Sequence, residues 1–295
     1  MAARRESVVA GIAFMVASTV AFALVNAVIK WEVASYPVGE VAFFRSLFSL
    51  IPCYAIVLPR AGLRAFRTER HFDHLKRAVS QLCSMCAIFI AFKLMPLGAA
   101  VAISFASPLF TTLFSFLILK EPVGVHRWSA LAVGFLGVLL VTNPGAGAFQ
   151  WGALFALANA VLISSVAVAI RKMSITESAE TLLVYQLTLL SLLTACLLPF
   201  GFVPPRLVDL SFLATAGIVN GIAQYWWTKS LHLAPASAVV PFNYLSLVWA
   251  SGMGFLVWDE MPTPSLIVGS AIVVGSGLYI LWRETGLRAR ARAEA

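Results

Sequence analysis

The sequence predicts an all-α membrane protein with ten transmembrane helices, arranged as two inverted repeats of five helices each. Three observations support this fold class. The composition is too apolar for a soluble chain, the apolar residues fall into ten runs that approach or reach membrane-spanning length, and several short phrases recur at a nearly constant offset.

Composition excludes a soluble protein. Of the 295 residues, 60% are hydrophobic and 12% are charged, whereas a soluble domain is about one quarter charged. The net charge is +8, but the basic residues lie in short segments between apolar runs, which is typical of membrane topology rather than of a nucleic-acid groove. We therefore expect the lipid bilayer, and no nucleic acid, as a partner.

Ten apolar runs define the predicted spans. A helix needs about 20 mostly apolar residues to cross a bilayer, and the fifth run is the shortest. Pro or Gly in many of the connections ends one helix before the next begins, and the runs are continuous rather than alternating, which excludes a β-barrel. The first run is expected to stay as a helix rather than to be a cleaved signal. The predicted spans are 8–29, 38–58, 74–93, 97–119, 127–142, 151–170, 179–199, 209–229, 235–257 and 264–282.

The distribution of positive charge predicts the orientation. With ten spans, 17 of the 21 Lys and Arg residues fall on the side that holds both termini, three fall on the other side, and Arg45 lies inside a span. Lys and Arg near span ends are retained in the cytoplasm. We therefore predict cytoplasmic termini and an inner (plasma) membrane location.

An internal repeat divides the chain into residues 1–145 and 146–295. Five spans per repeat is an odd number, so the second repeat is predicted to be inverted. Inverted repeats are a recurring plan of secondary transporters, with the substrate site near the bilayer midplane. The first and sixth spans align at an offset of 141. An offset of 139 aligns Leu94, Pro96, Ala99, Phe105 and Glu121, in that order, with Leu233, Pro235, Ala238, Tyr244 and Glu260.

Residues 77–145 resemble the first-repeat core of the drug/metabolite transporter superfamily, in its ten-helix EamA-type branch. The shared marks are the Pro96 turn, SPLF at 107–110, KEP at 120–122 and GFLGVLLV at 134–141. Arg45 stands where this family usually has an arginine in its second helix.

The second repeat departs from the family pattern. Leu247 stands where Pro108 predicts proline, and Asp259–Met261 replaces KEP. Within the family the chain is most similar to the YddG-type exporters of aromatic amino acids and related metabolites. The resemblance implies transport, with no catalytic residues and no cofactor.

Polar and aromatic side chains inside the predicted spans form the candidate substrate site, because polar groups are costly in a membrane and usually functional. Arg45 either pairs with a substrate carboxylate or snorkels to the nearby helix end. Aromatic residues could stack on a substrate or could pack against lipid and neighbouring helices. The predicted substrate-binding residues are Arg45, Gln81, Phe105, Asn159, Tyr185, Asn220, Gln224, Tyr225, Asn243, Tyr244 and Trp249.

The ionisable residues argue against ion coupling and metal chemistry. None of the 13 Asp and Glu residues lies at the middle of a predicted span, and the four His residues lie near span ends. We therefore expect facilitated diffusion or weakly coupled exchange. The four cysteines lie in apolar runs without metal-ligand spacing, and we expect them to act as small packing residues.

Several functions remain open at this stage. The leading prediction is export of amino acids, including aromatic ones, by alternating access. Uptake of a nucleoside- or vitamin-like metabolite and drug export are alternatives in the same class. A remote alternative is an intramembrane transferase, for which the nearest cluster of catalytic residue types is Glu69, His71, Asp73 and His74. Glycines in the fifth and tenth spans indicate helix packing or a dimer seam, so we expect a monomer or a weak homodimer.

Overall fold

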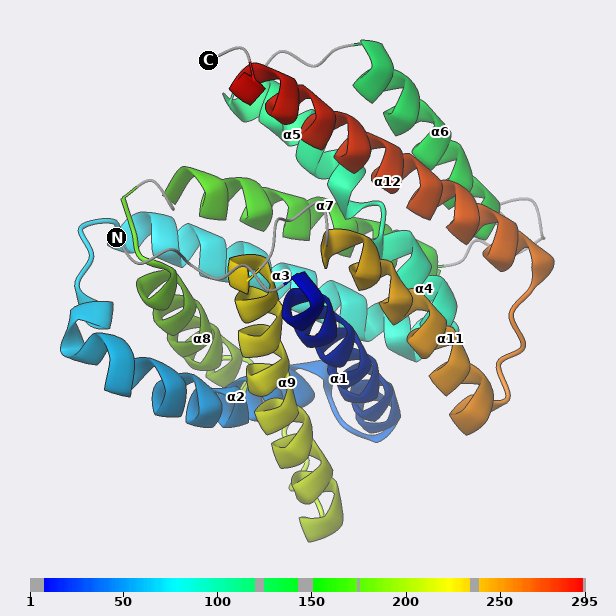
Figure 1. The fold of residues 1–295 in the computed structure, drawn as a ribbon. Coiled ribbons are helices and arrows are strands. Elements are labelled where there is room, and N and C mark those ends of the chain that lie inside the picture. The colour runs from blue at the N-terminus through cyan, green and yellow to red at the C-terminus, as the bar shows by residue number, and fades with distance from the viewer. Residues whose placement is uncertain (1–7, 120–124, 143–150, 174–175, 234–238, 294–295) are drawn as a thin grey trace.

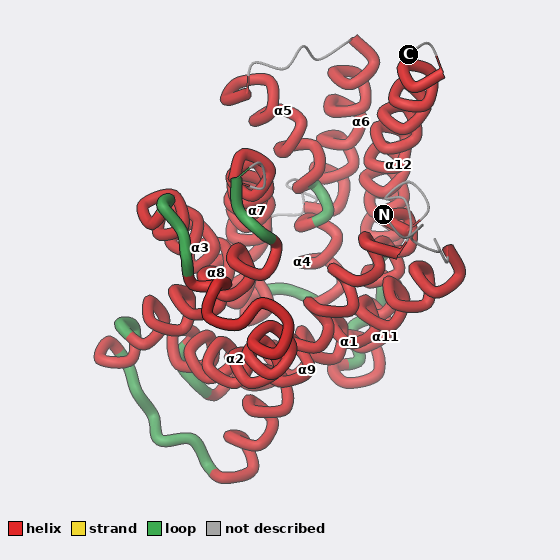
Figure 2. The backbone as a smooth tube through the Cα atoms, turned by 60° about the vertical axis from the view of Figure 1, so that its left-hand side comes forward, coloured by secondary structure: helices red, strands yellow, loops and turns green. Residues whose placement is uncertain are grey.

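The computed structural model describes residues 8–119, 125–142, 151–173, 176–233 and 239–293, and within these ranges it contains helices and loops but no strand (Figure 2). The helices follow the predicted spans closely. In the first half they are α1 (Val8–Ser35), α2 (Val38–Ala61), η1 (Gly62–Phe66), α3 (His71–Leu94), α4 (Leu97–Ser104), α5 (Ser107–Leu119) and α6 (Val125–Thr142). In the second half they are α7 (Trp151–Met173), α8 (Ala179–Ala195), η2 (Leu198–Phe200), α9 (Leu207–Leu233), η3 (Val240–Tyr244), α11 (Leu245–Trp258) and α12 (Pro264–Ala293).

Seven candidate membrane spans, by length and apolar composition, lie within the described ranges. They cover the predicted spans 1–4 and 6–8. Two shorter apolar helices, 128–141 and 264–279, fall on the fifth and tenth predicted spans. The start of the ninth predicted span, 235–238, lies outside the described residues.

The fourth predicted span is not one continuous helix. It is interrupted at residues 105–106, between α4 and α5. Pro108 has no amide hydrogen to donate to the Ser104 carbonyl, so the helical ladder cannot run through this point. The amides of Leu109 and Phe110 instead bond to the Ala106 carbonyl. The ninth span has a milder discontinuity, because the helix changes type without a gap: the 3-10 helix η3 ends at Tyr244 and α11 begins at Leu245.

The main helix contacts join the two halves of the chain. Helix α1 packs against α9, α3 against α7, and α6 against α12 (Figure 1). Helix α2 packs against both α8 and α9. The bundle is therefore built by interleaving the halves, and its buried core draws on helices from both, including Ile29, Phe89, Ala160 and Ala250.

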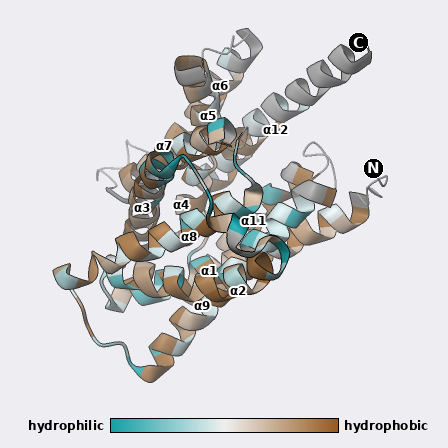
Figure 3. Ribbon diagram, turned by 90° about the vertical axis from the view of Figure 1, so that its left-hand side faces the viewer, coloured by the Kyte–Doolittle hydropathy of each residue, from teal (hydrophilic) through white to brown (hydrophobic). Residues whose placement is uncertain are grey.

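Large apolar side chains also cover the outside of the bundle. Leu136 of α6, Leu192 of α8 and Leu256 of α11 are all at least 60% exposed. Figure 3 shows apolar residues along most of the described helices, with hydrophilic residues gathered at several of the connections. An apolar exterior of this extent needs lipid around it.

Glycines set two of the closest helix contacts. A Cβ atom on Gly217 of α9 would lie 2.5 Å from the Phe48 Cβ atom and 2.7 Å from the Arg45 carbonyl oxygen of α2. A Cβ atom on Gly137 of α6 would lie 2.9 Å from the Gly269 carbonyl of α12. These glycines of the fifth and tenth spans therefore pack helices within one chain, as small residues do in membrane proteins.

Candidate functional site

Arg45 is held inside the bundle by a neighbour from the other half of the chain. It lies on the third turn of α2, and its Nη2 atom donates a hydrogen bond of 2.6 Å to Oδ1 of Asn220 on α9. Its Nη1 atom lies 2.9 Å from Sδ of Met85, and the guanidinium lies 5.7 Å from the centre of the Phe89 ring. The side chain therefore faces α3 and α9 instead of snorkelling to the helix end.

Arg45 has no counter-charge within the described part of the chain. The ion pairs there are Lys30 with Glu260 and Arg70 with Asp73. The Nε atom of Arg45 is buried and has no hydrogen-bond partner among the described residues. A partly buried cation in this condition is costly, so a ligand that supplies an acceptor would be stabilised here.

Close helix packing explains why Arg45 and Asn220 meet. Gly217 and Gly221 let α9 approach α2, and the Ser49 hydroxyl lies between the two helices, 2.7 Å from the Arg45 carbonyl and 2.9 Å from the Gly217 carbonyl. The Asn220 amide donates to Ser49 Oγ over 3.1 Å. Asn220 is thus fixed by two hydrogen bonds on the face of α9 that touches α2.

Asn159 joins three helices beside the break in the fourth span. Its Oδ1 atom accepts from Ser84 Oγ of α3 over 2.7 Å, and its Nδ2 atom donates to Ser104 Oγ at the end of α4 over 3.0 Å. Asn159 and Ser84 are both buried. The amide therefore positions the end of α4, and with it the neighbouring Phe105.

Gln81 has a partner that was not among the predicted site residues. The Nε2 atom of Gln186 on α8 donates to Oε1 of Gln81 on α3 over 3.2 Å. Gln186 lies near the middle of α8, and a midspan amide was the signal that could have selected it.

Phe105 and Tyr244 lie side by side at the two helix discontinuities. Their ring centres are 5.0 Å apart, and the rings are tilted by 41°. The Tyr244 hydroxyl lies so close to Gly277 of α12 that a Cβ atom there would clash with it. Nearby in sequence, the Trp249 indole donates to Thr19 of α1 over 3.3 Å.

These contacts form one connected series of residues. Arg45 touches Met85, and the adjacent Ser84 bonds to Asn159. Asn159 bonds to Ser104, and the adjacent Phe105 packs on Tyr244. The structure therefore links a cation, an amide and two aromatic rings through contacts and neighbouring positions in the chain.

Other predicted residues lie in different surroundings. The Tyr185 hydroxyl donates to the Phe66 carbonyl, and its ring stacks on His74 with centres 4.4 Å apart. The Tyr225 hydroxyl accepts from Arg60, and Tyr225 lines a surface pocket with Arg60, Glu180 and Lys229.

The two remaining predicted amides lie on α9 and in η3. Gln224 lies one turn beyond Asn220 on the same face of α9. Asn243 lies in η3, where its carbonyl accepts from Ser246.

A buried ion pair lies away from the predicted site. Lys30 of α1 forms a salt bridge with Glu260, which follows α11, and donates to the Met95 carbonyl over 3.1 Å. The second carboxylate oxygen of Glu260 accepts from the Leu97 amide over 2.9 Å. The pair therefore ties α1 and the α3–α4 turn to the α11–α12 connection.

Two carboxylates are fully buried near helix ends, Glu32 just beyond the first predicted span and Glu40 near the start of the second. Glu32 falls within α1, which continues to Ser35, and Glu40 falls within the first turn of α2. Each has an Oε1 atom that is buried without a hydrogen-bond partner among the described residues. They remain near helix ends rather than at midspan.

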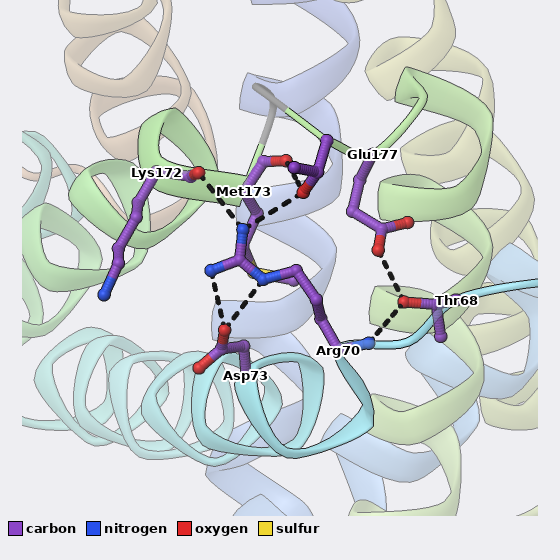
Figure 4. Close-up of polar contacts among 7 residues, drawn as sticks. Thr68, Arg70, Asp73, Lys172, Met173 and Glu177 are labelled. Atoms are coloured by element: carbon purple, nitrogen blue, oxygen red, sulfur yellow. Dashed lines mark hydrogen bonds and ion pairs between the residues drawn. The ribbon is translucent and has the colours of Figure 1, made fainter.

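The loop proposed for a transferase is occupied by structural contacts (Figure 4). Arg70 donates to Asp73 over 2.9 Å and also to the Lys172 carbonyl and the Thr176 hydroxyl. Thr68 donates to Glu177 over 2.6 Å. These bonds tie the α2–α3 connection to the α7–α8 connection. Within the described ranges, no three His, Cys, Asp or Glu residues are grouped to hold a metal ion.

The seven apolar helices of the described ranges and the apolar exterior of the bundle define a multi-pass membrane protein, consistent with the cell inner membrane. The EamA-like transporter family model matches residues 9–143 and again residues 150–282. The chain therefore belongs to the EamA-like transporter family, within the drug/metabolite transporter superfamily.

Curated relatives in this family are transporters of different metabolites. The chain is 30% identical to the riboflavin transporter of Rhizobium johnstonii, over 96% of this chain and 95% of that one. It is 26% identical to the S-adenosylmethionine uptake transporter of Rickettsia prowazekii, over 83% of each chain. It is 28% identical to the pseudopaline exporter CntI of Pseudomonas aeruginosa, over 90% of this chain and 93% of that one.

A solved crystal structure has the same fold, with a TM-score of 0.62 and 22% identity over 94% of this chain and 96% of that chain. The family and the names of these relatives point to small-molecule transport rather than catalysis. None of the three names is that of an amino-acid exporter. The YddG-type subgroup therefore stays a prediction.

Proposed function

We propose that the chain is an alternating-access carrier made of two inverted repeats, 1–145 and 146–295, with ten spans and both termini in the cytoplasm. The helix pairing supports this arrangement. Exchanging the two halves turns the α1–α9 contact into the α7–α3 contact, and it maps the α2–α8 and α6–α12 contacts onto themselves. The double match to one family model is also in keeping with a duplicated chain.

The proposed substrate is a planar, vitamin- or nucleoside-like metabolite, with riboflavin uptake as the specific case. The observation that carries this proposal is the Phe105–Tyr244 ring pair, which joins the α4–α5 break to the junction of η3 with α11. Discontinuous helices near the midplane form substrate sites in secondary transporters, and aromatic rings stack on flat ring systems. Asn220 and Arg45 supply hydrogen-bonding groups for the ring oxygens and nitrogens of such a ligand.

Export of amino acids is the second candidate, and Arg45 is the observation that favours it. A guanidinium without a counter-charge among the described residues is a suitable partner for a substrate carboxylate. An aromatic amino acid would also occupy the Phe105–Tyr244 pair. The two candidates differ in whether the substrate must carry a carboxylate.

Counterflow in proteoliposomes distinguishes the two candidates. Vesicles containing the purified full chain are loaded with unlabelled riboflavin or with unlabelled amino acids, and entry of labelled riboflavin, phenylalanine, methionine or threonine is followed without an ion gradient. Accumulation of riboflavin alone supports the first candidate, and accumulation of phenylalanine alone supports the second. No accumulation of any of these by folded protein would contradict both.

Direction of net transport needs a separate measurement. A carrier that needs no coupling ion runs down the substrate gradient in either direction, so counterflow reports the substrate but not the direction. Uptake of labelled riboflavin by intact cells that express the chain, compared with release from preloaded cells, tests the uptake proposal. Faster release than uptake at equal gradients would favour export.

A further inference from the structure

Two hydrogen bonds between the halves are related by the internal repeat. The offset of 141 carries Arg45 onto Gln186, and the offset of 139 carries Gln81 onto Asn220. Arg45 donates to the side-chain oxygen of Asn220 over 2.6 Å, and Gln186 donates to the side-chain oxygen of Gln81 over 3.2 Å. Exchanging the halves therefore turns one bond into the other.

The two pairs also occupy matching places along their helices. Arg45 and Gln186 are each the eighth residue of their helix, α2 and α8. Gln81 and Asn220 each lie 13 residues before the last residue of α3 and α9. In an inverted repeat such positions lie at equal depths from opposite membrane faces, so the two pairs lie on either side of the midplane.

Both pairs retain hydrogen-bonding groups that no other described residue uses. Buried Nε of Arg45 lacks a partner among the described residues. In the amide pair, the bond uses one hydrogen of Gln186 and the oxygen of Gln81. The other group of each side chain, the Gln186 oxygen and the Gln81 amino group, makes no hydrogen bond within the described ranges. A guanidinium only donates, whereas an amide both donates and accepts, so the two pairs suit different chemical groups.

We propose that Gln186 and Gln81 form a second half-site, equivalent to the half-site of Arg45 and Asn220, and that one substrate molecule contacts both. This inference rests on the proposed transport function and assigns one end of the substrate to each half-site. The guanidinium binds the acceptor-rich end of the substrate, such as a ring dione or a carboxylate. The amide pair binds an end that both donates and accepts, such as hydroxyl groups. The single charge thereby fixes which end of the substrate faces each half of the chain.

Transposing the charge tests this equivalence. Riboflavin binding to the purified full chain is measured in detergent by the quenching of flavin fluorescence. We expect R45Q to weaken binding about tenfold, as loss of one charge-assisted hydrogen bond would. The double variant R45Q/Q186R restores one cation at the equivalent position. On a logarithmic scale, we expect its dissociation constant to return most of the way to that of the wild type.

A second variant covers the case in which the double variant does not fold. Gln186→Leu keeps the side-chain size, and we expect it to weaken binding about tenfold. The matched control is Leu192→Ala, on the exposed face of α8, which should bind like the wild type. All variants are compared by size-exclusion elution and by melting temperature.

The outcomes separate this inference from the proposed function. A folded double variant that binds as weakly as R45Q, or a Q186L variant that binds like the wild type, would overturn the second half-site. If the wild type binds no riboflavin, that part of the proposed function fails and the same series is measured with labelled phenylalanine. Recovery of phenylalanine binding by the double variant supports the two half-sites. If the wild type binds neither riboflavin nor phenylalanine, the proposed function and the second half-site are both overturned.

Discussion

The ring centres of Phe105 and Tyr244 lie 5.0 Å apart, although the two residues are 139 positions apart in the chain. This offset is one of the two at which the sequence repeats, so the proposed repeats make the two residues counterparts. Counterparts in a twofold arrangement touch only near the symmetry axis. If the repeats are inverted as proposed, this contact lies near the axis that relates them, where secondary transporters place their substrate sites.

Replacing Phe105 by Ala is expected to weaken substrate binding while leaving the fold intact. Loss of one stacking ring should lower the apparent affinity in counterflow about tenfold, and Phe105→Tyr should retain most of the activity. Phe212→Ala on α9, where the ring is partly exposed, is the matched control. Equal activity of the F105A and F212A variants would argue against a ring-stacking site.

Asn220→Asp is expected to change stability and transport in opposite directions. The new carboxylate would lie beside the Arg45 guanidinium, whose present partner Oδ1 is 2.6 Å away. Neutralising an unpaired buried cation should raise the melting temperature in detergent. The same carboxylate would compete with the substrate and lower the transport rate about tenfold or more. Asn220→Leu should instead lower both quantities, and an N220D variant with normal transport would exclude Arg45 from the site.

Glu260→Gln is expected to destabilise the protein. It would leave the mostly buried Lys30, with 9% side-chain exposure, without its counter-charge, and removing one partner of a buried pair costs about 3 kcal/mol or more. The double variant K30M/E260Q should recover much of the loss, since the introduced amide oxygen would still accept from the Leu97 amide. Thermal unfolding in detergent measures both changes.

The exposed Arg70–Asp73 pair supplies the control for this prediction. Its side chains are 22% and 39% exposed, and surface pairs contribute at most about 1 kcal/mol. Asp73→Asn should therefore shift the melting temperature much less than E260Q. Similar shifts in melting temperature for the two variants would show that burial adds little to the stabilisation by the Lys30–Glu260 pair.

Transport is expected to proceed without an imposed ion gradient. Within the described ranges, no carboxylate forms a hydrogen bond or ion pair with Arg45, Asn159 or Asn220. Counterflow rates should therefore agree within about twofold with and without an inward proton gradient, because no described carboxylate contacts these side chains to take up a proton. Uptake that depends on the gradient, and that is lost when buried Glu32 or Glu40 is replaced by Gln, would contradict this expectation.

Local sequence patterns determined the membrane class and the helix positions. Apolar run length is a property of each segment by itself, so the predicted spans agree with the described helices to within a few residues at most ends. The family could also be predicted from the sequence, because its characteristic motifs are short local segments between residues 77 and 145. The break at residues 105–106 was missed, although Pro108 was the available signal.

The sequence by itself determined which residues are costly to place in a membrane, and Arg45, Asn159 and Asn220 were found in that way. Only the tertiary structure decided which of them meet. Arg45 reaches Asn220 because two glycines bring α9 against α2, and Gln186 reaches Gln81 because α8 packs on α3. A hydrogen bond between residues 175 or 105 positions apart depends on helix packing between the halves, and glycine spacing marks a packing face without specifying the partner helix.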